Sequence, residues 1–325
     1  MRGAVILTVI LLVSAALGLV LGQIHLSLDA LWQGLWGGEG AGALTIRILR
    51  GPRVAVALGA GAALGLSGAI FQMLLRNPLA APDVMGFTSG AGLAIVASIF
   101  LGLTLPIPLV AAAGGITAAL LVGMLAYRRG HGAPALTLVL VGIGVGFVTL
   151  SIGTFIMTRL PGPEATEAQR WLSGSLAARD WGHALQVWAI GIALGIVLAV
   201  QIRALRLLEL GDDLAAGLGL KVDRARWCLA LTAVLLAAAA VAVAGPIPFV
   251  ALMAAPLGMR LTNARDPAAR LVAAAGVGAA ITVLADLAAR ATIPGLQLPI
   301  GILTGILGAP YLLWLLSREM ERGEL

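Results

Sequence analysis

Arginines near acidic or apolar segments are the most chemically distinctive residues of this chain. Arg50 and Arg53 stand three residues apart before a long apolar run, and Asp286 and Arg290 stand four apart at the end of another. Two arginines at the start of a helix oppose its dipole, so we interpret Arg50 and Arg53 as a site for an acidic partner. The spacing of Asp286 and Arg290 fits either a local ion pair or a part in the same docking.

Residues that could hold a metal or carry out catalysis are scarce. Cys228 is the sole cysteine, and His25, His131 and His183 are far apart, so they cannot by themselves form a disulfide framework or a closed metal site. The sequence has no phosphate-binding P-loop, and no nucleophile and base are paired within an apolar run. We therefore expect no cofactor and no enzymatic activity, and any ATP hydrolysis must belong to another chain.

Composition places the chain in a membrane. Of its 325 residues, 60% are hydrophobic and 11% are charged, which excludes a water-soluble globule with a polar exterior. The long uninterrupted apolar runs favour helices over the alternating pattern of a barrel. The net charge of +6 comes from basic residues that lie between apolar runs, so it indicates topology and not nucleic-acid binding. We expect one transmembrane domain over residues 1–325.

The apolar runs predict about ten membrane-spanning helices. With Arg2 inside, both termini are cytoplasmic, and most basic residues fall in cytoplasmic segments. Arg50, Arg53 and Arg290 belong to the minority that faces outward, which supports a partner there. The predicted spans lie near residues 3–22, 54–75, 86–103, 107–127, 134–157, 182–202, 226–244, 247–262, 271–289 and 299–317.

One cytoplasmic segment, residues 203–224, lies between the sixth and seventh predicted spans. Within it, Leu207 to Gly219 reads as two short helices broken at glycines. Its leucines and alanines form an apolar surface that lipid would not cover, and such a surface indicates a protein partner. A helix lying on lipid headgroups is the alternative.

Ordered motifs recur along nearly the whole chain: Arg50 to Arg53, Gly65 to Gln72, Arg76 to Ala80, Pro82 to Phe87, Trp171 to Leu176, Gly211 to Gly219, Gly245 to Ile247, Ala285 to Arg290, Leu298 to Gly301 and Gly308 to Pro310. Together they resemble the iron-chelate and vitamin B12 permeases of ATP-binding-cassette importers, the FecCD type. The sequences of residues 82–87 and 209–213 most resemble the corresponding segments of ferric catecholate permeases of the enterobactin type. One departure is Ala255-Pro256-Leu257, where the family commonly has a Pro-His or Pro-Gln pair.

The resemblance implies an all-α integral membrane protein with the type II ABC importer permease fold, in the bacterial cytoplasmic (inner) membrane. Two such permeases, identical or homologous, would surround a central path above two ATPase subunits. A periplasmic or lipid-anchored substrate-binding protein would deliver a ferric siderophore, with a catecholate favoured. Vitamin B12 or haem remains an alternative cargo.

The resemblance also implies roles for individual residues. Outward-facing arginines that receive acidic residues of the substrate-binding protein are Arg50, Arg53 and Arg290. Positions that narrow the path on the cytoplasmic side are Asn77, Leu79, Pro134 and Ala135. The loop that couples to the ATPase contains Glu209, Gly211, Asp212, Asp213, Ala215, Leu218 and Gly219.

The chief rival is a secondary transporter driven by an ion gradient, which would need ionisable residues near mid-membrane. The predicted spans are almost free of such residues. Asp286 is the nearest exception, and it lies toward the outer end of its span. An intramembrane enzyme is disfavoured because no buried cluster of catalytic residues is evident.

Overall fold

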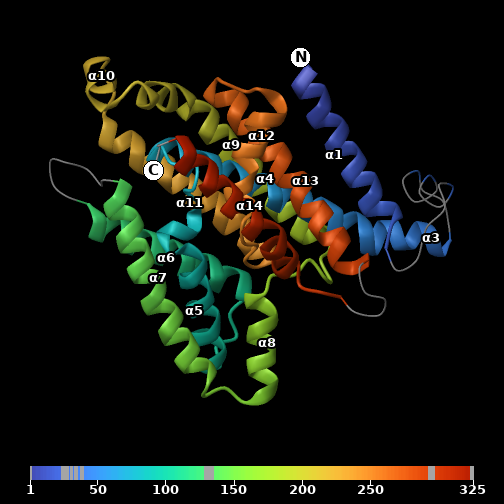
Figure 1. The fold of residues 1–325 in the computed structure, drawn as a ribbon. Coiled ribbons are helices and arrows are strands. Elements are labelled where there is room, and N and C mark those ends of the chain that lie inside the picture. Colours follow the sequence, from blue (N-terminus) through green and yellow to red (C-terminus); the bar gives the residue numbers. More distant parts are fainter. Residues whose placement is uncertain are drawn as a thin grey trace.

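The computed structural model describes residues 2–22, 29, 32, 36, 40–127, 135–291 and 297–322, and these residues form helices and loops without a strand (Figure 1). A π-helical turn, η1 (Thr45–Arg50), and a 3-10 turn, η2 (Pro82–Met85), join longer helices. The α-helices are α1 (Arg2–Val20), α3 (Ala41–Leu44), α4 (Gly51–Leu75), α5 (Phe87–Phe100), α6 (Ile107–Ala126), α7 (Ala135–Met157), α8 (Gly162–Leu172), α9 (Trp181–Glu209), α10 (Asp212–Gly217), α11 (Val222–Ala244), α12 (Val250–Thr262), α13 (Pro267–Ala291) and α14 (Ile300–Arg322).

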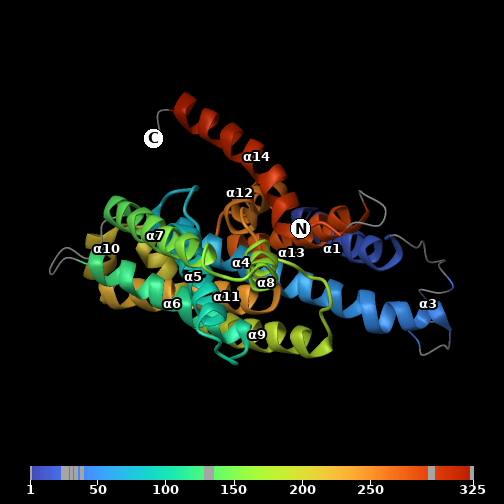
Figure 2. The same ribbon diagram turned by 90° about the horizontal axis from the view of Figure 1, so that it is seen from below.

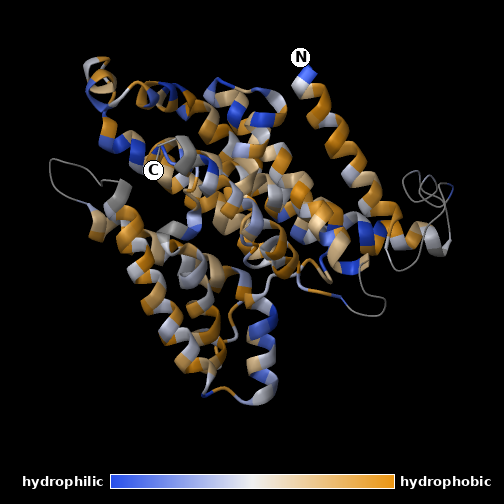
Figure 3. Cartoon of the chain, viewed as in Figure 1, coloured by the Kyte–Doolittle hydropathy of each residue, from blue (hydrophilic) through white to orange (hydrophobic). Residues whose placement is uncertain are grey.

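The expected all-α membrane fold is confirmed. Every span predicted from the sequence coincides with a helix, and hydrophobic residues predominate along these helices in the colouring of Figure 3. Among the described residues, seven helical segments have the length and hydropathy to cross a bilayer, whereas α5, α12 and the apolar part of α14 are shorter. The short helices α8 and α10 lie outside the predicted spans.

Helix α4 forms the centre of the bundle and packs against α9, α11, α12 and α13. Its glycines allow direct backbone contact, as the small-residue spacing of Gly61 and Gly65 predicts. A Cβ atom on Gly61 would lie 2.3 Å from the Gly278 carbonyl oxygen, and one on Gly68 would lie 1.8 Å from the Ala251 carbonyl oxygen. Any side chain at these positions would force α4 away from α12 and α13.

The helical path into α4 differs from the prediction. Residues 41–75 form one continuous helical segment, so Arg50 and Arg53 do not lie at a helix start, and the dipole argument applied to them was wrong. The segment continues because the Gly51 N–H bonds to the Ile46 carbonyl in a π-type turn ahead of Pro52. The Arg47 carbonyl, which Gly51 would use in an α-helix, accepts a 2.8 Å hydrogen bond from Trp181 Nε1.

The segment between the sixth and seventh spans also differs in detail. Residues 203–209 continue α9 without a break, so the chain forms one short helix, α10, and not two. The reason is that no helix-breaking residue occurs before Gly211, whose positive φ of 107° ends the helical path.

The periphery is loosely packed within the chain. Helix α14 projects away from the bundle (Figure 2). Helix α7 exposes large apolar side chains along much of its length, including Leu140, Phe147 and Phe155. These faces must meet lipid or another protein, because apolar surfaces of this size are not left in water.

Candidate functional site

A buried ionic cluster joins α4 to α13. The Arg53 guanidinium holds Asp286 through three hydrogen bonds: Nε lies 2.9 and 3.0 Å from the two carboxylate oxygens, and Nη2 lies 2.8 Å from Oδ1. Arg290 Nε lies 3.5 Å from the other side of the same carboxylate. The predicted local pair of Asp286 and Arg290 is therefore present, but Arg53 makes the better contact with Asp286.

The same cluster fixes the end of α1. Arg50 Nη1 donates hydrogen bonds to the carbonyls of Leu19 and Val20 at 2.9 and 2.7 Å, and Arg290 donates to the Gly18 carbonyl. These carbonyls belong to the last turn of α1, where no further helical N–H groups follow to satisfy them. Arg50, Arg53 and Arg290 thus lie in one cluster, and their docking role stays a prediction. The sequence could not predict the contacts of Arg50 and Arg290 with α1, because the acceptors are backbone carbonyls and every residue has one.

A small cavity of about 100 Å³ opens beside this cluster. Its wall includes Arg53 and Asp286, together with Arg170 of α8 and Ser175 of the loop after it. Sequence analysis missed α8, because a polar amphipathic helix between two spans has no membrane signal. The guanidinium groups of Arg53 and Arg170 thus line one opening, and Asp286 is the single carboxylate among the lining residues.

The loop beside α8 is held by its own polar contacts. Asp180 caps α9, and the pKa of this exposed carboxyl is lowered, first because it accepts a hydrogen bond from the His183 backbone N–H and second because it contacts the His183 ring. Arg179 lies over the Trp171 ring, with its guanidinium carbon 5.3 Å from the ring centroid. These contacts fix the start of α9 near the arginine cluster.

Polar contacts also join α4, α9 and α13 at the end of the bundle opposite to the arginine cluster. The Arg76 side chain, just after α4, donates a 2.8 Å hydrogen bond to the Leu208 carbonyl near the end of α9. Glu209 forms an ion pair with Arg270 at the start of α13. Arg53 and Asp286 lie toward the other ends of α4 and α13. At 1.5 Å per residue, Arg53 is about 35 Å along α4 from Arg76, and Asp286 is about 24 Å along α13 from Arg270.

The loop around α10 presents apolar side chains at this far end. Leu210, Leu214 and Leu218 are 55%, 62% and 60% exposed, whereas Ala215 is fully buried. Positive φ angles at Gly211 and Gly219 close the turns on either side of α10. Asp212 pairs with Arg226 at 2.8 Å, and Asp213 lies next to it in the first turn of α10. The loop is thus a fixed projection with an apolar surface.

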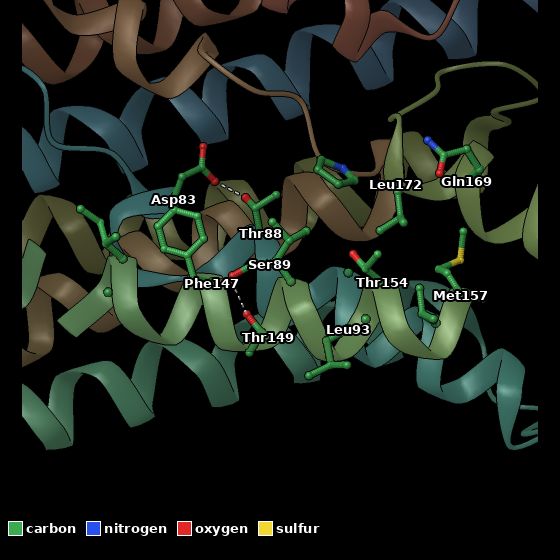
Figure 4. A pocket seen from close by; sticks show the side chains of 18 residues that line it. Asp83, Thr88, Ser89, Leu93, Phe147, Thr149, Thr154, Met157, Gln169 and Leu172 are labelled. Carbon is green, nitrogen blue, oxygen red and sulfur yellow. Dashed lines mark hydrogen bonds between the residues drawn. The ribbon is translucent and has the colours of Figure 1, made fainter. Parts of the chain in front are cut away.

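A larger cavity of about 710 Å³ lies along α5 and α7 (Figure 4). Asp83 and Thr88 stand at one end of it, and Met157 and Gln169 stand at the other. Thr88 donates to the Asp83 carboxylate. The wall between is made of glycines, apolar side chains and hydroxyls.

The predicted path-narrowing residues have simple local roles where they are described. Asn77 Oδ1 accepts a 2.8 Å hydrogen bond from the Leu79 N–H and shapes the turn that follows α4. Arg76, at the end of α4, adopts the left-handed conformation with φ of 51°. Ala135 begins α7, and Pro134 lies outside the described residues.

Comparisons with known proteins agree with this arrangement. The family model of the FecCD transport family matches residues 10–318. This chain is a member of the FecCD transport family. It is 40% identical to the ferric enterobactin transport system permease protein FepG of Escherichia coli over 98% of this chain and 97% of that protein.

Other FecCD relatives carry names for different cargoes. The Fe(3+)-citrate import system permease protein YfmE of Bacillus subtilis is 38% identical over 98% of this chain and 95% of its own. The vitamin B12 import system permease protein BtuC of Yersinia enterocolitica is 36% identical over 96% of this chain and 91% of that protein. A solved inward-facing metal-chelate-type ABC transporter has a TM-score of 0.83, with 28% identity over 96% of this chain and 97% of that one.

Membership of the FecCD family establishes the general function. The chain has the type II ABC importer permease fold and is a transport permease of the metal-chelate type, not itself an enzyme. Permeases of this kind work with ATPase subunits and substrate-binding proteins.

Proposed function

We propose that this permease moves a ferric siderophore of the catecholate class through the bacterial cytoplasmic membrane, with both termini in the cytoplasm. The similarity to the ferric enterobactin permease supports this cargo. The wide, weakly polar cavity along α5 and α7 supports a bulky solute, since side chains that bind metal tightly would retain it. Vitamin B12 is the second candidate, supported by the relative named for it.

The arginine cluster at one end is the observation that carries the mechanism. Arg53 and Arg290 both contact the carboxylate of Asp286, so these three side chains together have a net charge of +1, and Arg50 lies beside them on the α1 carbonyls. A carboxylate from the substrate-binding protein enters the cavity beside Arg53 and Arg170 and offsets this charge. Complementary charge then guides the loaded protein onto the permease and fixes its orientation.

The α10 loop at the other end couples transport to ATP. Exposed Leu214 and Leu218 fit an apolar cleft on the ATPase, and the flanking glycines and the pair of Asp212 with Arg226 hold the loop in shape. Movement of the ATPase subunits is transmitted through α9, which continues unbroken from the loop to the arginine end. The turn at Asn77 and Leu79 and the start of α7 at Ala135, with Pro134 before it, narrow the path on this side.

The exposed apolar faces of α7 and α14 pack against a second permease, identical or homologous, within a single transmembrane domain per chain. The cavity along α5 and α7 then faces the central path between the two permeases. This arrangement places no part of the cargo in lipid.

The docking proposal is tested by charge reversal. Arg53→Glu and Arg170→Glu should each reduce uptake of ferric enterobactin into proteoliposomes that contain the ATPase and the loaded binding protein. Arg159→Glu is the matched control, because Arg159 is exposed and lies over Phe155 without a carboxylate partner among the described residues. Recovery when an acidic residue of the binding protein is changed to Arg would establish the contact. Equal uptake by all three variants would refute it.

The cargo proposal is tested with ferric enterobactin, ferric citrate and vitamin B12, each supplied on a binding protein able to carry it. Uptake of the ferric catecholate is expected to be faster than uptake of the other two. Faster uptake of vitamin B12 would contradict the siderophore assignment while leaving the docking proposal intact.

A further inference from the structure

Two ion pairs of opposite polarity join the last turn of α9 to the start of α13. The Arg206 guanidinium binds both oxygens of the Asp266 carboxylate, with Nε 2.9 Å from Oδ1 and Nη2 3.1 Å from Oδ2. Three residues further along α9, Glu209 pairs with Arg270. A shift that brought Glu209 toward Asp266 would place like charges together, which is unfavourable. The two pairs thus form a clamp that fixes the register of α9 against α13.

A third contact at this point comes from α4. The Arg76 side chain donates a hydrogen bond to the Leu208 carbonyl, within the same turn of α9 that carries the clamp. Helices α4 and α13 are themselves in direct backbone contact, because a Cβ atom on Gly278 would lie 2.3 Å from the Gly61 carbonyl oxygen. Interiors packed this closely have low compressibility and transmit strain. A displacement of the last turn of α9 is therefore passed to α4 and α13 together.

The clamp lies next to the α10 loop and far from the arginine cluster. Glu209 is the last residue of α9 and stands two residues before Gly211, where the helical path ends. Helix α13 continues unbroken from the clamp to the cluster, and at 1.5 Å per residue Asp286 is about 24 Å along it from Arg270. The carboxylate that holds Arg53 is thus carried by the same helix that the clamp grips.

The exposure of the clamp indicates that folding stability is not its main role. Arg206 and Asp266 are exposed, and the side chains of Glu209 and Arg270 remain partly exposed. Ion pairs between exposed side chains stabilise a fold only slightly. The two parallel hydrogen bonds of Arg206 nevertheless specify orientation as well as position. The clamp therefore suits control of the position of α9 relative to α13.

We propose that the clamp transmits movement of the α10 loop into α13, and so to Asp286 and Arg290 at the other end. This role rests on the proposed function, in which the loop meets the ATPase and the arginine cluster receives the substrate-binding protein. When the ATPase displaces the loop, α13 moves with the last turn of α9 and carries the cluster with it. The affinity for the binding protein then depends on the nucleotide state of the ATPase, and this dependence is reciprocal.

The test measures the affinity of the cargo-free substrate-binding protein for the complex of permease and ATPase, with and without a non-hydrolysable ATP analogue. The ratio of the two dissociation constants reports the coupling between the two ends. Glu209→Arg and Arg270→Glu each place like charges together, and each should bring this ratio nearer to one by at least about two-fold. The swapped variant Glu209→Arg/Arg270→Glu restores the ion pair and should restore the ratio.

Arg265→Glu is the matched control, because it reverses an exposed charge next to Asp266 that has no carboxylate partner in the part of the chain that the structure describes. This variant should keep the ratio of the unaltered complex. Rescue by the swapped variant would exclude both lost folding and a direct contact of Glu209 with the ATPase as the cause of the effect.

Two results would overturn the clamp alone, provided that the unaltered complex responds to the ATP analogue. One is an unchanged ratio in both single variants, and the other is a swapped variant no better coupled than the single ones. An unaltered complex whose affinity for the binding protein does not respond to the analogue would instead overturn the proposed coupling of the α10 loop, and the clamp with it.

Discussion

Removing the carboxylate of Asp286 is the perturbation that most directly probes the arginine cluster. Asp286→Asn keeps the size of the side chain but removes its charge, and so takes the carboxylate partner from Arg53 and Arg290. Asp286 is 2% exposed, and it receives three hydrogen bonds from Arg53 alone. Breaking a buried ion pair by removing one partner costs about 3–5 kcal/mol, because the remaining charge stays buried and unpaired.

The loss is measured as the change in unfolding free energy of the purified permease in detergent micelles. Asp266→Asn is the matched control, because its contact with Arg206 is on the surface, with side chains 46% and 56% exposed, and should contribute much less. The double variant Asp286→Asn/Arg53→Gln removes both partners of the buried pair. We expect it to be more stable than Asp286→Asn by about 0.5–3 kcal/mol, the usual range of coupling between contacting residues.

The reasoning would be refuted by either of two results. One is an Asp286→Asn variant no less stable than the Asp266→Asn control, which would mean that the cluster is hydrated. The other is a double variant less stable than the single one, which would mean that Arg53 stabilises the bundle through contacts other than Asp286.

Three further predictions concern separate parts of the chain. Gly68→Ala should destabilise the permease by about 1–3 kcal/mol through overpacking, whereas Gly191→Ala, with open space around it, should not. The lowered pKa of Asp180 stabilises the fold above the ordinary carboxyl pKa, so a pH titration of thermal stability should show that contribution lost as pH falls through the lowered value, and Asp180→Asn should abolish this loss. Leu214→Ser/Leu218→Ser should weaken ATPase binding in a pull-down without lowering the unfolding temperature; unchanged binding would refute the coupling role.

The helices were predictable because a bilayer demands long apolar runs, and the sequence supplies them without interruption. Helix ends were less predictable where polar residues continue a helix. Arg203 and Arg206 suggested a loop, yet they extend α9, since neither residue breaks a helix and only Gly211 does. The polar helix α8 was missed because it has no apolar run that would mark a helix in the sequence.

The candidate site was predictable in its residues but not in its contacts. The charges of Arg50, Arg53 and Arg290 stood out because these arginines belong to the outward-facing minority of basic residues. Arg53 was not predicted to pair with Asp286, because the two lie 233 residues apart and only helix packing brings them together. The role of the α1 carbonyls was equally hidden, since backbone acceptors occur at every position.

The central claim is that this permease works in an ATP-driven importer. The most direct measurement is uptake of radiolabelled ferric siderophore into liposomes that contain the permease, its ATPase and its binding protein, with ATP, without ATP, and with an imposed ion gradient. Uptake that requires ATP and collapses when Arg50 and Arg53 are both changed to Glu is the predicted result. Uptake driven by an ion gradient alone would contradict it.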